Sequence, residues 1–260
     1  MGDAKRRQIS DADFLKTQPE CVYCGQSPST IEHFPPRAFF ENRIWPEGFR
    51  FASCTECNAK TRHEDQVVSF LAGLRLQDGP WDAQTLRLFE GIKNNRPDVC
   101  EEWFDKISRN ELRRRLRTAF GPEQGDKWRR RGLSIIHYGP MTHQCFKIFG
   151  LKLMTTLYFK HFGRRCDGVA FARHQSMIDQ KASIEAALEL APQLTLTSRN
   201  NRSLSGQFVY RFAEESTEGA LFVVAQLGPQ LGYVGHAFSK SFWEGREGAA
   251  RWQKIDRRVL

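Results

Sequence analysis

The sequence predicts an α+β fold in which a small N-terminal zinc module precedes a larger α+β domain. Three observations support this prediction: two Cys-x-x-Cys pairs near the N-terminus, helical periodicity of apolar residues in the middle, and short β-rich runs after residue 192. We place the zinc module at residues 15–75 and the α+β domain at 76–260. Within the latter we expect helices across 82–162 and strands across 192–240.

Composition and charge narrow the classes of function. The 260 residues are 40% hydrophobic and 27% charged, values typical of globular proteins rather than disordered chains. The formal net charge of +9 favours nucleic acid as a partner, because neutralising phosphates releases condensed counterions. The longest apolar stretch, 148–159, contains Lys152 and falls well short of the roughly 20 residues that span a bilayer. We expect a cytoplasmic protein without membrane contact, since no signal-peptide pattern is present.

The cysteine spacing is the strongest motif in the chain. Cys21 and Cys24 form one pair, Cys54 and Cys57 form another, and 29 residues separate the pairs. Two residues between cysteines let both thiolates reach one ion, and four thiolates complete a closed, structural Zn²⁺ site. A redox pair would instead require a thioredoxin-like βαβ pattern, which the sequence lacks. The remaining cysteines are expected to be reduced thiols: Cys100, Cys145 and Cys166.

Local signals place the elements of the N-terminal module. Residues 11–20 have the character of a short helical turn, and residues 21–34 that of a hairpin whose strand ends at two prolines, which cannot donate to a ladder. A helix is expected from Cys54 to about Leu74. Ser53 and Glu56 have the spacing of a capping box at its start.

The rest of the chain divides into a helical and a β-rich part. We expect helices at about 82–93, 98–119 and 141–162, the last with a clear apolar stripe. The β-rich runs are 194–198, 206–213, 220–227 and 231–238, and turn residues separate them. The segment 76–81 is the best candidate for a boundary between the module and the larger domain.

Three short motifs together resemble a known family. The knuckle "CVYCG", the dipeptide in "EHFPP" and the helix opening "CTECN" occur in the order found in HNH endonucleases with the ββα-metal fold, in their zinc-stapled subgroup. The resemblance covers residues 21 to about 65. It implies a divalent-metal-dependent endonuclease that hydrolyses phosphodiester bonds and leaves a 5′-phosphate. DNA is favoured over RNA on the resemblance alone.

The resemblance also implies roles for single residues. His33 stands at the position of the general base, while Glu32 and Asn58 stand at positions that hold the catalytic Mg²⁺ or Mn²⁺. The chemistry is consistent with these roles, because carboxylate and amide oxygens are hard donors of the kind that both cations prefer. An imidazole can deprotonate water near neutral pH without being a metal ligand.

Two departures from the family pattern favour a competing interpretation. The central asparagine is missing, and Asn42 is the candidate to support His33 in its place; Thr61 stands where the family often has a lysine. The alternative is a non-catalytic, zinc-finger-like module that binds nucleic acid or protein. In that case Glu32 and His33 would merely be hydrogen-bonded.

Basic residues provide candidate contacts to nucleic acid. Arg37 follows the two prolines, and Arg62 lies on the same expected helix face as Asn58. A basic region in the middle of the chain could track a phosphate backbone while an indole stacks on a base, or could form solvated helix faces. Its residues are Arg113, Arg114, Arg115, Arg117, Lys127, Trp128, Arg129, Arg130 and Arg131.

Overall fold

A computed structural model describes most of the chain. The described residues are 10–43, 46, 48–74, 81–104, 108–130, 136–176, 197–200, 207–228 and 231–244. The side chains of Asn42 and Trp128 lie outside this description, as do Arg131 and residues 76–80 of the expected domain boundary.

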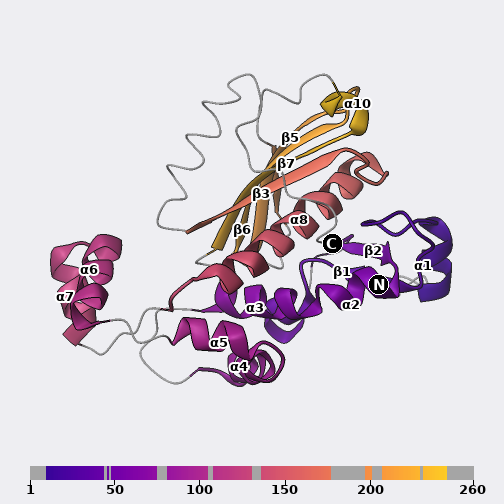
Figure 1. The fold of residues 1–260 in the computed structure, drawn as a ribbon. Helices are drawn as coiled ribbons and strands as arrows, with labels where there is room; N and C mark the ends of the chain where they lie inside the picture. The colour runs from indigo at the N-terminus through magenta and orange to yellow at the C-terminus, as the bar shows by residue number, and fades with distance from the viewer. Residues whose placement is uncertain are drawn as a thin grey trace, which may run out of the picture.

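The N-terminal part consists of a two-stranded hairpin followed by helices (Figure 1). Strands β1 and β2 pair antiparallel, with Thr30 opposite Ser53 and His33 opposite Arg50. The elements in chain order are α1 (Asp11–Thr17), β1 (Thr30–His33), η1 (Arg37–Phe39), η2 (Glu41–Arg43), β2 (Arg50–Ser53), α2 (Thr55–Lys60) and α3 (Arg62–Gly73).

The expected helix from Cys54 to Leu74 differs from the observed structure in two ways. It divides at Thr61, where a non-helical backbone (φ −110°, ψ 5°) separates α2 from α3. The capping box of Ser53 and Glu56 was wrong, because Ser53 belongs to the ladder of β2. The N-cap is Cys54, whose Sγ accepts a hydrogen bond from the backbone N–H of Cys57.

The larger part combines helices with one sheet, which confirms the α+β class. The helices are α4 (Ala83–Asn95), α5 (Pro97–Trp103), α6 (Arg109–Phe120), α7 (Pro122–Arg130), α8 (Pro140–Phe162) and α10 (Lys240–Trp243). The strands are β3 (Val169–Ser176), β4 (Thr197–Asn200), β5 (Phe208–Glu215), β6 (Ala220–Leu227) and β7 (Leu231–Phe238). They form an antiparallel sheet in the order β3-β7-β6-β5-β4. None of the described helices combines the length and apolarity needed to cross a bilayer.

Two outcomes in this part differ from the expectation. The helix expected at 98–119 is represented by α5 and α6, with residues 105–107 between them outside the description. Strand β3 lies before the expected β-rich region and pairs with β7 along its whole length. Its sequence mixes apolar residues with Arg173 and His174, so it lacks the apolar run by which the other strands were found.

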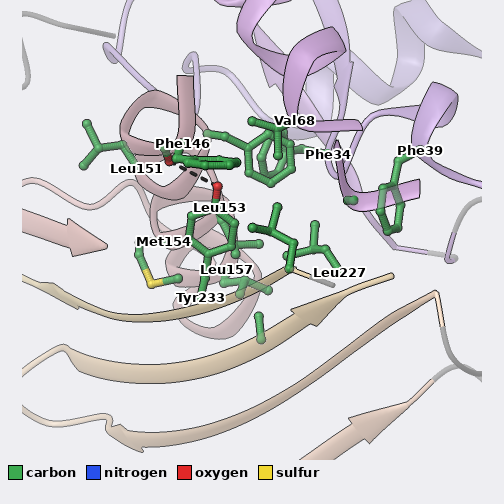
Figure 2. Close-up of a cluster of buried hydrophobic side chains, with 14 of the residues drawn as sticks. Phe34, Phe39, Val68, Phe146, Leu151, Leu153, Met154, Leu157, Leu227 and Tyr233 are labelled. Atoms are coloured by element: carbon green, nitrogen blue, oxygen red, sulfur yellow. Dashed lines mark hydrogen bonds between the residues drawn. The ribbon is translucent and has the colours of Figure 1, made fainter. Parts of the chain in front are cut away.

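Helix α8 is the central element of the fold. It runs between the sheet on one side and α3 with the hairpin on the other (Figure 1). Its residues are therefore buried on all sides between Ile148 and Tyr158, as expected for a helix covered on both faces. Figure 2 shows Phe34 and Val68 near Phe146 of this helix, and Tyr233 of the sheet donating a hydrogen bond to the carbonyl of Phe146. One hydrophobic cluster thus includes residues from both predicted domains.

A partly buried carboxylate caps the start of α8. Glu102 of α5 accepts hydrogen bonds from the backbone N–H groups of Gly139, Met141 and Thr142 at 2.8–2.9 Å, and from the hydroxyl of Thr142. These contacts satisfy helix N–H groups that have no partner within the helix. Burial disfavours the carboxylate, but the hydrogen bonds outweigh it and lower the pKa of Glu102. The cap fixes where α8 enters the core.

We predict that Gly150→Ala destabilises the protein by about 1–3 kcal/mol through overpacking. A Cβ at Gly150 would lie 2.6 Å from Cβ of Ala172 and 2.9 Å from the ring of Tyr233, so α8 and the sheet would have to separate. The control is Gly73→Ala, which meets no atom within 4 Å. Urea unfolding measures both; equal stability of the two variants would contradict the close approach of α8 to the sheet.

Candidate metal centre and nucleic-acid interface

The four predicted cysteines converge on one point. Each can offer a sulfur ligand, and these sulfur atoms all lie within 4.8 Å of one another; the Sγ atoms of Cys24 and Cys54 are 3.7 Å apart. A tetrahedral Zn²⁺ site with Zn–S bonds of about 2.3 Å has S···S separations of about 3.8 Å. The cluster therefore has the composition and the spacing to hold a metal ion such as zinc.

The local fold explains this convergence. Cys21 and Cys24 lie in the turn before β1, where Gly25 adopts φ 81° and its N–H donates to the carbonyl of Cys21. The second pair lies at the N-cap and in the first turn of α2, where the helix dipole favours thiolate. Burial disfavours the thiolate of Cys21, but backbone N–H groups, including those of Cys24 and Cys54, outweigh it and lower its pKa to about 7.

The two residues of the Glu-His dipeptide point to opposite faces of the hairpin. Successive side chains alternate along a strand, and β1 presents Glu32 on the side of Thr30 and His33 on the side of Arg50. Glu32 is 5% exposed and lies between the hairpin and helices α3 and α8, whereas His33 is only half-buried. The structure therefore does not bring this carboxylate and this imidazole to one point.

Glu32 belongs to a buried charge network centred on Lys152 of α8. The Nζ atom of Lys152 lies 3.3 Å from Oε2 of Glu32, 2.5 Å from Oδ2 of Asp65 and 2.9 Å from Oγ1 of Thr61. It also lies 5.0 Å from the ring centroid of Phe34, within the range of a cation–π contact. The ammonium is 0% exposed and thus touches protein on every side.

Burial and neighbouring charge oppose each other in this network. Burial alone would lower the pKa of Lys152, but Asp65 and Glu32 outweigh that effect and raise it, so the amine stays protonated. Two carboxylates share this one cation. Burial raises the pKa of Asp65 to about 7, the ammonium opposes the rise, and Glu32 adds to it.

Asn58 of α2 lies on the same side of the hairpin as Glu32. Its Nδ2 donates to Oγ1 of Thr30 at 3.0 Å, and Thr30 in turn donates to the carbonyl of Ser53. These bonds fasten α2 to both strands. The amide therefore has a clear role in holding the helix on the hairpin.

The residues predicted to hold a catalytic cation do not fit one in this arrangement. Glu32 is turned into the core, and a full positive charge already stands 3.3 Å from its carboxylate. A second cation there would be repelled by that ammonium and could not reach a phosphodiester at the surface. The roles of Glu32 and Asn58 as ligands of Mg²⁺ or Mn²⁺ remain predictions from the resemblance, without support from these contacts.

His33 lies instead within a basic cluster on the outer face of the hairpin, formed with Arg37, Arg43 and Arg50. Arg37 Nη2 lies 2.6 Å from His33 Nε2, and because a guanidinium only donates, this nitrogen accepts. Burial first, and then the charges of Arg37 and Arg50, lower the pKa of His33 to about 4. The imidazole is therefore neutral at physiological pH. Asp11 is the acidic member of the surroundings and pairs with Arg50 at 2.6 Å.

The other predicted nucleic-acid contacts lie on two separate surfaces. Arg62 is exposed at the start of α3. The predicted basic region forms α6 and α7, which pack against each other and stand apart from the rest of the fold in Figure 1. Residues 109–130 contain eight basic and three acidic residues, a formal net charge of +5. Their exposed basic side chains include Arg113, Arg114, Arg117, Arg129 and Arg130.

Ion pairs order part of this helical hairpin. Glu111 accepts from Arg114 and Arg115 at 2.7–2.9 Å, and Asp126 of α7 lies 3.3 Å from Arg113. Close packing at Gly125, where a Cβ would meet the carbonyl of Leu116 at 2.6 Å, holds the two helices together. The arginines are thus arranged on a defined surface rather than on independent helices.

The residues that contact Glu32 and His33 are only weakly marked in the sequence. Asp65 and Arg50 were given no role, and Lys152 was noted only within an apolar stretch, although a lysine inside an apolar helix is a signal, because a buried ammonium requires a counter-ion. The position of Arg50 opposite His33 required the strand register, which the sequence alone did not provide. Comparisons with protein-family models, curated proteins and solved structures gave no match.

We predict that Cys21→Ser abolishes metal binding at the cysteine cluster and lowers the melting temperature, because structural zinc sites supply on the order of 10 kcal/mol in small modules. Metal content by atomic emission and a thermal melt measure the effect. Cys100→Ser is the matched control, since Cys100 is a free thiol outside the cluster. Unchanged metal content and melting in Cys21→Ser would show that the cluster holds no structural ion.

Proposed function

We propose that this chain binds the phosphate backbone of nucleic acid through two basic surfaces, on a scaffold that a Zn²⁺ ion stabilises at the four cysteines. The first surface is the basic cluster around His33, and the second is the α6–α7 hairpin. DNA is the expected ligand, on the resemblance to HNH endonucleases. None of the seven cysteines, all of which the structure describes, forms a disulfide bond, which is consistent with a reducing compartment such as the cytoplasm.

The observation that carries this proposal is the arrangement of the basic cluster. Arg37 and Arg50 are held on the outer face of a hairpin whose other face is locked into the core by Lys152 and Glu32. Each Arg side chain is positioned by neighbours, Arg37 by His33 and Arg50 by Asp11 and the ring of Phe14. Preordered guanidinium groups bind phosphate with less loss of side-chain entropy than flexible lysines do.

The α6–α7 hairpin extends the same chemistry away from the module. Its net charge of +5 is more than half of the formal charge of the whole chain. Arginine donors on a protruding helical pair can follow a phosphate backbone without reading base sequence. Binding through both surfaces would give affinity with a steep dependence on salt and little sequence preference.

A second candidate function is hydrolysis of the bound strand, in the manner of an HNH endonuclease. One observation favours it: His33 is neutral, half-buried and next to a guanidinium, as a general base beside a phosphate ligand would be. A phosphate bound at Arg37 would raise the pKa of His33 towards the range where it can accept a proton from water. The missing central asparagine and the engaged carboxylate of Glu32 are the reasons why binding is proposed first.

We predict that Arg37→Ala weakens binding of a fluorescein-labelled DNA duplex by about 3–10-fold and reduces the salt slope of log Kd by about one, because one phosphate contact is lost. Fluorescence anisotropy between 50 and 200 mM NaCl measures both quantities. Arg129→Ala with Arg130→Ala should act in the same way. The control is Arg211→Ala, an exposed arginine on β5; an equal loss in this variant would leave the basic cluster without a specific role.

We predict, for the second candidate, that wild type nicks supercoiled plasmid in Mg²⁺ or Mn²⁺ and that His33→Ala reduces the rate by at least about 100-fold, since a general base contributes that much. Gel electrophoresis over time measures the rate, and His137→Ala is the control. Absence of nicking by wild type, with DNA binding intact, would restrict the function to binding. Equal nicking by both proteins would remove His33 from the chemistry.

A further inference from the structure

The pocket between β1, α3 and α8 has the donors of a divalent-cation site but contains an ammonium group. Glu32 and Asp65 contribute carboxylates and Thr61 a hydroxyl, and Lys152 Nζ lies within 3.3 Å of one oxygen of each. Hard oxygen donors of this kind are what Mg²⁺ and Mn²⁺ prefer. The lysine arrives from α8, 87 residues beyond Asp65 and 120 beyond Glu32 in the sequence.

The pocket also contains oxygen atoms that do not bind the ammonium. Among the described residues, Oδ1 of Asp65 and the hydroxyl of Tyr23 are buried and have no hydrogen-bond partner. An ammonium has three N–H donors, and Glu32, Thr61 and Asp65 already receive them. A divalent cation accepts six or more oxygen ligands and could use such atoms. The surroundings therefore offer more oxygen donors than a lysine requires.

The net charge of the pocket also favours a divalent cation. Two carboxylates face one ammonium, so full ionisation leaves one net negative charge in a site that is closed to solvent. Taking away the lysine amine would leave two carboxylates buried without any counter-ion, and they would then either take up protons or bind a cation. A divalent ion would neutralise both carboxylates at once.

We infer that Lys152 takes the place of a divalent cation between Glu32 and Asp65, so that this pocket is a cation site closed by the protein's own ammonium group. Loss of that amine then turns the pocket into a binding site for Mn²⁺ or Mg²⁺. The inference is independent of the proposed binding to nucleic acid, because none of its residues belongs to the basic cluster.

The test uses the full chain with metal bound at the cysteines and Mn²⁺ as the probe. In wild type, 1 mM Mn²⁺ should leave the melting temperature unchanged. Lys152→Met keeps most of the side-chain volume without the charge; it should melt lower and regain at least about 5 °C in 1 mM Mn²⁺. This gain should disappear when Glu32→Gln and Asp65→Asn are added.

Lys160→Met is the matched control, because Lys160 also lies on α8 but donates to the carbonyl of Gly48. It should show no response to Mn²⁺. If Lys152→Met is unfolded without added metal, the same titration is followed as recovery of the far-ultraviolet circular dichroism of the wild type. Recovery supports the inference, and its absence at 1 mM Mn²⁺ overturns it.

Two other results would also overturn the inference. One is a folded Lys152→Met protein that does not respond to Mn²⁺. The other is a wild-type protein that Mn²⁺ stabilises and that loses this response in Glu32→Gln, since the carboxylate would then hold a cation beside the lysine. Neither result depends on whether Arg37 contacts DNA. The proposal for nucleic-acid binding is therefore tested separately, by the Arg37→Ala variant.

Discussion

The buried ammonium of Lys152 is the contact on which the arrangement of this protein depends. It joins three segments that are distant in sequence: the hairpin through Glu32, the helical pair α2–α3 through Thr61 and Asp65, and the central helix α8. Removing one member of a buried ion pair leaves the other charge without a partner in a low-dielectric interior. This destabilises the protein far more than the loss of a surface ion pair. The network therefore fixes the position of the hairpin on α8.

The position of the hairpin on α8 determines which of its side chains point into the core and which point outward. With Glu32 fixed inward, the alternation of the strand turns His33 outward, where Arg50 from the neighbouring strand stands opposite it. The basic cluster is thus a geometric consequence of the buried network. The carboxylate of Glu32, the imidazole of His33 and the amide of Asn58 are distributed over two faces, with Glu32 buried on one and His33 half-buried on the other.

The cysteine cluster and the α+β class could be predicted from the amino-acid sequence. The four cysteines were found because their spacing is typical of a site that can hold one ion, and the α+β class was found because the apolar residues of helices and of strands recur with different periods. The helix break at Thr61 was missed, since no glycine or proline marks it in the sequence; in the structure Thr61 accepts a hydrogen bond from Lys152 of α8. The surroundings of Glu32 could not be derived, because they depend on a residue 120 positions away whose partner no local rule identifies.

The shared core has a consequence for how the N-terminal part can exist. Phe34 and Val68 bury their side chains in the same cluster as Phe149 and Tyr233, so the interior surface of the hairpin and α3 is completed by α8 and the sheet. A fragment that stopped near residue 75 would expose Phe34 and Val68 to water, together with the carboxylates of Glu32 and Asp65 that Lys152 neutralises. The part that contains the cysteine cluster is therefore not structurally independent, and transferring it to another chain would require a matching helix to be transferred with it.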